Sequence, residues 1–344
     1  MTTVGKASSA SKNLATSGST GCHVREAASS SRLRLGISRC LLGDEVRYDG
    51  GHQRDGFLTD VLGRYVEWVP VCPEVEVGMG VPREPIRLVG RADAPRLLGA
   101  NSNTDHSAAM ARFSERKVRE LEGLDLCGYV FKTNSPSCGM ARVRVFNARG
   151  APTATGTGVF ARVFMTHFPL IPVEEEGRLQ DAGLREHFIE RVFCYWRWRD
   201  LAASDVTKSA LIDFHTRHKL LLMAHDPVRY RALGRLVADG RGDRAAALSD
   251  LYSREFMAAL AVKPTANNHV NVLEHIRGHF SRQLTSDERR ELTGLIEDYR
   301  QGLIPLVVPI TLMKHYVRRF RISYLADQVY LNPNPKELML RNHV

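Results

Sequence analysis

The sequence lacks a long apolar run: none of its 344 residues lies in a stretch that approaches the roughly 18 consecutive apolar residues of a membrane-spanning helix. This argues against a spanning helix and favours a soluble protein with no membrane partner. Cysteine is also scarce, with six residues and no Cys-x-x-Cys pair, which argues against a disulfide-stapled secreted scaffold. We therefore expect reduced thiols and a cytoplasmic location.

Acidic residues are outnumbered, because 48 Lys and Arg against 38 Asp and Glu give a formal net charge of +10. This surplus could attract an anionic partner, but it also fits a solvated basic surface. The hydrophobic share of 43% and the charged share of 25% are ordinary for a globular protein and argue against wholesale disorder or a collagen-like chain. The length corresponds to about two domains.

The first segment, residues 1–32, is rich in Ser, Ala, Thr and Gly and has few large apolar side chains. Such a composition predicts a disordered tail. No basic stretch is followed by an apolar one, so a secretory signal is not expected, whereas the Ser-rich, acid-poor character leaves a transit-like segment open.

Residues 33–168 alternate short apolar runs with helical patterns, which predicts a mainly parallel, Rossmann-like α/β sheet domain. Strands are expected at 33–38, 66–71, 127–131 and 141–146. Helices are expected where apolar residues recur at helical spacing, near 57–65 and 110–121 and after the Gly-rich string 155–158.

Pro169, Pro172 and the acidic run Glu174–Glu176 mark a boundary, so residues 169–180 are expected to form a linker. Apolar residues at helical spacing dominate beyond it, and Thr285–Glu288 (TSDE) has the pattern of a capping box. Residues 181–344 are therefore predicted to form an all-α helical domain.

Three of the cysteines occupy equivalent positions. Cys40 follows the first predicted strand, Cys72 the second and Cys138 the third. Ligands of an open parallel sheet bind outside the carboxyl ends of the strands, so we expect these three thiols to converge. Cys127 lies within an apolar strand and Cys194 in an aromatic helical segment, which favours core positions for both.

Convergent thiols could form a zinc site, hold an iron–sulfur cluster or act as a redox nucleophile with resolving partners. Structural zinc usually takes closely spaced pairs of ligands, which are absent here. A set of three thiolates suits a [4Fe–4S] cluster with one iron free to bind a soft atom such as sulfur. Buried structural cysteines remain an alternative.

Short motifs in both halves carry family resemblances. In residues 33–168 they are Ser38–Gly43 (SRCLLG), Tyr48–Gly50 (YDG), Cys72–Glu74 (CPE), Pro82–Arg83 (PR) and Ser135–Gly139 (SPSCG), and this part resembles the TudS family of thiouracil desulfidases. The second half resembles the helical YbgA family, through Arg217–Lys219, Asn271–Phe280, Asp298–Tyr316 and Tyr330–Pro333.

The TudS resemblance implies that Cys40, Cys72 and Cys138 bind three irons of a [4Fe–4S] cluster, and that the fourth iron binds the sulfur of a small thiolated substrate, such as a thiouracil-like base or a thioamide. The implied reaction is hydrolytic and non-redox: water adds to the carbon, sulfide is released and the oxo product departs. Glu74 is implied as a proton carrier. Ser135 is the implied catalytic serine, with Ser137 as the alternative.

Other residues leave competing interpretations open. Gly156 and Gly158 precede a predicted helix and could present N–H groups to an anion or to the edge of a base. Arg83 could bind a carbonyl oxygen or a phosphate, or it could be a surface residue. The pairs His215/His218 and His275/His279 each share a helix face, where packing is favoured over metal binding.

The stretch Lys314–Arg321 (KHYVRRFR) mixes basic and aromatic residues and could contact RNA, or it could be a basic helix face. An RNA-binding protein with a structural or redox-sensing cluster is therefore the alternative function. We favour the small-molecule substrate over RNA.

Overall fold

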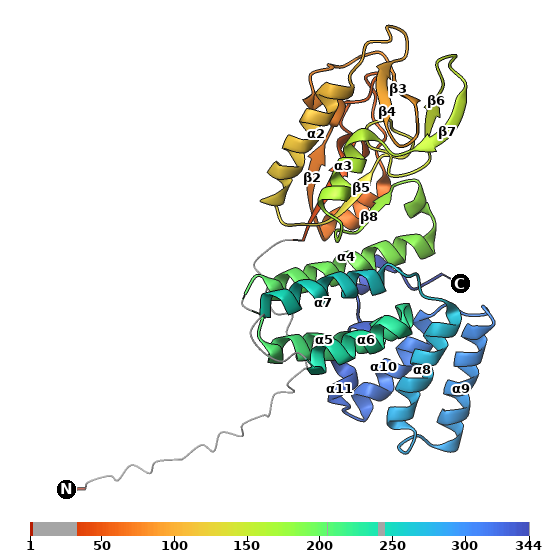
Figure 1. The fold of residues 1–344 in the computed structure, drawn as a ribbon. Coiled ribbons are helices and arrows are strands. Elements are labelled where there is room, and N and C mark those ends of the chain that lie inside the picture. The colour runs from red at the N-terminus through yellow and green to blue at the C-terminus, as the bar shows by residue number, and fades with distance from the viewer. Residues whose placement is uncertain (3–32, 205, 240–244, 344) are drawn as a thin grey trace. The chain divides into compact units, whose positions relative to one another are not determined.

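The structure, a computed structural model, describes residues 1–2, 33–204, 206–239 and 245–343 (Figure 1). The tail predicted for residues 1–32 therefore lies outside the described residues, apart from its first two positions.

The first sheet contains four parallel strands in the order β2-β1-β5-β8. The inner strand β5 is buried at all six positions, as expected for a parallel strand covered on both faces. The strands predicted from the sequence at 33–38, 66–71 and 127–131 are confirmed. Their bounds are β1 (Arg34–Ser38), β2 (Glu67–Val71), β5 (Leu126–Phe131) and β8 (Val173–Glu175).

The second sheet has the order β4-β3-β6-β7, with β3 and β6 parallel and the outer strands antiparallel to them. Only β6 was predicted, as part of 141–146. The missed strand β7 is exposed over most of its length, so it has no alternating apolar pattern. The bounds are β3 (Ile86–Gly90), β4 (Pro95–Gly99), β6 (Val143–Phe146) and β7 (Pro152–Gly156).

Helices α1 (Pro73–Glu76), α2 (Ser107–Glu122) and α3 (Val159–His167) accompany the sheets, and α2 and α3 pack on one another. An aromatic cluster lies between α3 and β5, where Tyr129 stacks on Phe131 at 4.2 Å and contacts Phe164 at 4.6 Å between ring centroids. A Cβ on Gly36, the neighbour of Tyr129 in β1, would lie 2.1 Å from the Tyr129 ring, so glycine is required there.

The segment 169–180, which we expected to be a linker, contains β8 and a short 3₁₀ turn (Arg178–Gln180). Strand β8 pairs with β5, so the first sheet continues as far as Glu175. Glu174 and Glu175 of the acidic run belong to this strand and Glu176 follows it. All three glutamates are buried, which the charge pattern alone does not reveal.

The second half is helical, which together with the parallel-rich sheets confirms the predicted fold class. Its core is a large apolar cluster, and Thr285 and Glu288 form the predicted capping box. No helix among the described residues is long and apolar enough to span a membrane. The helices are α4 (Ala182–Ala202), α5 (Lys208–His225), α6 (Pro227–Asp239), α7 (Ala245–Leu260), α8 (Ala266–Phe280), α9 (Ser286–Arg300), α10 (Val307–Arg319) and α11 (Ser323–Ala326).

Helix α4 also packs on the first sheet. One apolar cluster contains Leu35 and Val130 of the sheet together with Ile189 and Val192 of α4. The two predicted domains thus share part of their core, and the division at 169–180 stays a prediction.

Candidate functional site

The three strand-end cysteines open into one cavity of about 780 Å³. Cys40 lies in the 3₁₀ turn Arg39–Leu42 after β1, Cys72 is the N-cap of α1 directly after β2, and Cys138 lies in the loop after β5. Glu74 and Ser135 line the same cavity. The structure therefore brings all five predicted site residues together, while their roles stay predictions.

Each of the three thiols is largely shielded from solvent. Burial raises the pKa of the Cys40 thiol to about 11, and burial is also the main cause of the raised pKa values of Cys72 and Cys138. Cys72 Sγ lies 3.8 Å from the carbonyl oxygen of Val46, to which its thiol donates. A metal centre bound here would have to displace the thiol protons, because thiolates are the ligands.

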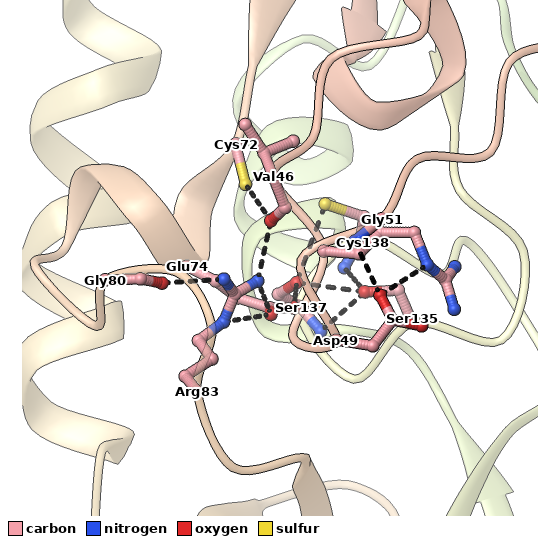
Figure 2. Close-up of polar contacts among 11 residues, drawn as sticks. Val46, Asp49, Gly51, Cys72, Glu74, Gly80, Arg83, Ser135, Ser137 and Cys138 are labelled. Carbon is pink, nitrogen blue, oxygen red and sulfur yellow. Dashed lines mark hydrogen bonds and ion pairs between the residues drawn. The ribbon is translucent and has the colours of Figure 1, made fainter.

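Glu74 is held by partners on both carboxylate oxygens (Figure 2). Ser137 Oγ donates to Oε1 at 2.7 Å, and Arg83 Nε donates to Oε2 at 3.0 Å. The Arg83 side chain is only 6% exposed, and it also donates to the carbonyl oxygens of Gly80 and Val46. Arg83 was a possible phosphate ligand in the sequence analysis. In the structure its guanidinium group is already hydrogen-bonded to Glu74 and to two carbonyl oxygens, so it positions Glu74.

The two candidate serines differ in their contacts. Ser135 Oγ accepts hydrogen bonds from the backbone N–H groups of Cys138, at 3.1 Å, and Ser137, at 3.3 Å, so it shapes the turn. Ser137 Oγ contacts Glu74 and lies 3.6 Å from Cys138 Sγ. The two hydroxyls are 3.0 Å apart. Ser137 is therefore the serine with direct access to both Glu74 and a thiol.

Two glutamates of the acidic run fix the loop that carries these groups. Glu175 Oε1 accepts from the N–H groups of Met140 and Ala141, at 2.8 and 3.3 Å, and its Oε2 accepts from Thr133 Oγ1 at 2.8 Å. Glu176 accepts from the backbone N–H of Thr133 at 2.7 Å. The sequence analysis missed these residues because it assigned them to a linker.

The N-terminus of α3 also binds this loop. Gly158 N–H donates to the carbonyl oxygen of Gly139 at 2.8 Å, and Val159 N–H donates to that of Pro136 at 3.1 Å. A Cβ on Gly158 would lie 2.6 Å from the carbonyl oxygen of Ser137, so a side chain has no room here. The suggestion that this glycine presents its N–H to a bound anion is therefore wrong, because the N–H is already used.

A pair of cations forms one wall of the cavity. Arg87 of β3 and Arg144 of β6 are neighbours across two parallel strands, because the next residues, Leu88 and Val145, are paired. Neither guanidinium takes part in an ion pair within the described part of the chain. Lys132, which also lines the cavity, is instead neutralised by Glu176.

The cavity suits a cysteine-bound cluster better than a single ion. Among the described residues, no group of three His, Cys, Asp or Glu side chains is close enough to hold one metal ion. A cluster has a different requirement, since separate thiolates bind separate irons. The fully buried hydroxyl of Tyr129 has no hydrogen-bond partner. Burial raises the pKa of Tyr129, and the charges of Cys138, Glu76, Cys72 and Cys40 raise it further. Three soft donors around an open cavity, with an orphaned donor nearby, fit an iron–sulfur cluster.

The other candidate residues lie in the helical half. His215 Nδ1 is 3.1 Å from Tyr252 Oη, and His218 Nδ1 donates to the carbonyl oxygen of Phe214 at 2.7 Å. The rings of His275 and His279 pack edge to face at 5.3 Å.

The basic stretch on α10 is partly engaged in intramolecular contacts. Lys314 Nζ donates to Asn332 Oδ1 at 2.6 Å, Arg319 pairs with Glu288, and Tyr316 is buried. These contacts reduce the number of groups in the stretch that are free for RNA.

Comparisons with known proteins agree with both resemblances. Residues 35–176 match the family described as 2-thiouracil desulfurase, and residues 219–335 match a family of unknown function, DUF1722. The uncharacterized protein YbgA of Escherichia coli (strain K12) is 35% identical over 155 residues, which cover 44% of this chain and 90% of that protein.

Two further relatives also match part of this chain. The uncharacterized protein YbbK of Bacillus subtilis (strain 168) is 28% identical over 130 residues, covering 36% of this chain and 85% of that protein. A solved structure of a [4Fe-4S]-dependent thiouracil desulfidase, TudS, is 29% identical, with a TM-score of 0.37, and the match covers 44% of this chain and 97% of that one. The chain thus belongs to the YbgA family and joins a TudS-type domain of the thiouracil desulfurase family to a YbgA-type domain.

Proposed function

We propose that this protein removes sulfur from a thiolated pyrimidine, using a [4Fe–4S] cluster held by Cys40, Cys72 and Cys138. The observation that carries the proposal is the convergence of three thiols, each following a different parallel strand, on one cavity that also contains the Glu74–Ser137 pair. The match to the thiouracil desulfurase family supports the same reaction class.

When bound, the cluster supplies a Lewis-acidic iron for the thiocarbonyl sulfur. The chain's own residues move the proton. Glu74 accepts hydrogen bonds from Ser137 and Arg83, which hold its side chain in place as a base for the attacking water. Ser137 passes a proton between the cavity and Glu74, while Ser135 keeps the loop in shape.

The substrate carries an anionic group in addition to the thiolated ring. A free pyrimidine has no charge to pair with the wall formed by Arg87 and Arg144, and the cavity of about 780 Å³ is within the range of about 300–1,000 Å³ that suits larger ligands. A phosphate-bearing form of the base satisfies both features, because guanidinium groups recognise phosphate by paired hydrogen bonds.

The experiment is to load the protein with its cluster under anaerobic conditions and to measure iron content and sulfide release with 4-thiouracil and 4-thiouridine monophosphate. Cys72→Ser should lose most of the iron and all sulfide release. Cys127→Ser is the matched control, because Cys127 is a buried cysteine that does not line the cavity. It should keep both iron and sulfide release.

Cluster loss in Cys127→Ser with retention in Cys72→Ser would refute the ligand assignment. Loaded wild-type protein that releases no sulfide from either compound, yet binds RNA with a steep salt dependence, would favour the RNA-binding alternative. Equal turnover of 4-thiouracil and 4-thiouridine monophosphate would show that Arg87 and Arg144 do not recognise a phosphate group of the substrate.

A further inference from the structure

The helical half contains a second cavity, of about 200 Å³, that shares no lining residue with the cysteine cavity. Its walls come from the start of α4, the start of α8, the end of α9 and the C-terminal segment. The volume is below the range of about 300–1,000 Å³ for drug-sized ligands, so an occupant has to be a small molecule. Charged and polar side chains line much of it, namely Glu186, Glu190, Lys263, His269, Tyr299 and His343.

Two glutamates of α4, the buried Glu190 and the partly buried Glu186, share Arg341. Both oxygens of Glu190 have a partner, since Oε1 accepts from His225 Nε2 at 2.7 Å and Oε2 from Arg341 Nη2 at 2.9 Å. Glu186 accepts from Arg341 Nε at 3.1 Å with Oε1 only. Its Oε2 lies 3.5 Å from Nε2 of His343 and accepts no hydrogen bond among the described contacts.

The second oxygen of Glu186 is therefore short of partners. Its environment is consistent with this shortage, because burial raises the pKa of Glu186 to about 7. A cation placed in the cavity would stabilise the carboxylate.

The cavity is positively charged where α8 begins. Ala266, the first residue of this 15-residue helix, lines the cavity, so the positive end of the helix dipole faces the cavity. Lys263 lines it too, and its ammonium group makes no hydrogen bond or ion pair within the described ranges. Tyr299 and His269 also line the cavity, and His269 Nδ1 is already hydrogen-bonded to Tyr330 Oη at 3.0 Å.

We propose that this cavity binds a small zwitterion of the α-amino acid class, with its ammonium group at Glu186 and its carboxylate at Lys263 and the N-terminus of α8. The placement gives each charged end of the ligand an opposite charge that the protein leaves incompletely paired. The proposal is independent of the desulfidase proposal, since the two cavities share no residue.

The test is isothermal titration calorimetry of the full-length protein with the common α-amino acids. For an amino acid that binds, the amine without its carboxylate and the N-acetyl derivative without its ammonium should each bind at least tenfold more weakly. Glu186→Gln and Lys263→Ala should each weaken binding by at least tenfold. Lys336→Ala is the matched control, because Lys336 is an exposed lysine of the same half that lies outside the cavity.

Thermal unfolding of each variant separates loss of binding from loss of folding. Lys263→Ala should unfold at the wild-type temperature, because Lys263 is exposed. The proposal is overturned if no α-amino acid binds at millimolar concentration. It is also overturned if the charge-deleted analogues bind as tightly as the parent, or if Lys263→Ala binds like Lys336→Ala.

Discussion

The surroundings of Glu74 differ from those of an ordinary surface carboxylate. Arg83 and Ser137 both donate to it, and its side chain is 14% exposed. Gln has the same shape but cannot accept the proton, so Glu74→Gln should lower turnover by about 10²- to 10⁴-fold while iron content stays unchanged. Iron analysis and sulfide release on the same loaded sample measure the two effects.

Arg91→Gln provides the control for this variant, because Arg91 lies in an exposed ion pair with Asp93 outside the cavity. It should retain both iron and turnover. Wild-type turnover in Glu74→Gln would remove Glu74 from the proton transfer, and loss of iron would show that it acts in assembly instead.

The sequence predicted which residues line the cavity but not the role of each. Cys40, Cys72 and Cys138 could be predicted because each follows a strand, and parallel strands end at one edge. The choice between Ser135 and Ser137 depends on side-chain directions within one turn, which spacing does not encode.

At the scale of elements, strand β8 holds the loop that carries Cys138. Glu175 binds two backbone N–H groups of that loop, and hydrogen bonds to a charged group contribute about 1.5–3 kcal/mol. Glu175→Gln replaces one acceptor oxygen by an N–H₂ donor, so the loop should loosen. We expect faster release of cluster iron to a chelator than in the wild type.

The neighbouring variant Glu174→Gln is the control for this effect. Glu174 pairs with Arg178 and makes no hydrogen bond to the loop among the described contacts. Its iron release should match the wild type. If both variants released iron at the wild-type rate, β8 would not be what holds the loop.

Helix α5 carries a histidine that makes stability depend on pH. Burial lowers the pKa of His218 to about 3, whereas the pKa of a histidine in the unfolded chain is about 6.5. The unfolded chain therefore binds more protons below about pH 6.5, so the stabilisation is complete above that pH and is lost as the pH falls towards 3. One such group contributes a slope of up to about 1.4 kcal/mol per pH unit.

The variant His218→Phe removes this group and keeps an aromatic ring beside Phe214, whose centroid is 4.0 Å away. Denaturant unfolding between about pH 6 and 4.5 should give a shallower pH dependence than the wild type. An unchanged slope would show that His218 is not neutral in the folded protein.

The sequence predicted strands and helices correctly where apolar residues are continuous or recur at regular spacing, and it missed them where this pattern is absent. The strands β1, β2 and β5 and the helix α2 have continuous or regularly spaced apolar residues. Strand β7 is exposed, and β8 has three residues, all glutamate or valine. Both are held by pairing with a neighbouring strand, which a local pattern does not show.

At the scale of the whole molecule, the sheet half and the helical half meet through α4. Val192 of α4 approaches β5 at Gly128, where a Cβ would lie 2.8 Å from Val192 Cγ2 and 3.0 Å from Leu35 Cδ2. The glycine is therefore required by close packing between an element of each half. The sequence did not predict this contact, because the boundary at 169–180 was placed from prolines and charge alone.

Gly128→Ala tests the contact in the intact chain. Overpacking of a core costs about 1–3 kcal/mol, so the variant should unfold at lower denaturant concentration than the wild type. The double variant Gly128→Ala/Val192→Ala removes the clashing methyl groups and should recover part of the loss, because residues in contact are energetically coupled. Gly123→Ala is the matched control. Gly123 has a negative φ and nothing within 4 Å of its Cβ position, so the stability of this variant should not fall below that of the wild type. If Gly128→Ala were as stable as Gly123→Ala, or if the second substitution only added to the loss, α4 would not pack on β5 as described, and the two halves would be independent folding units.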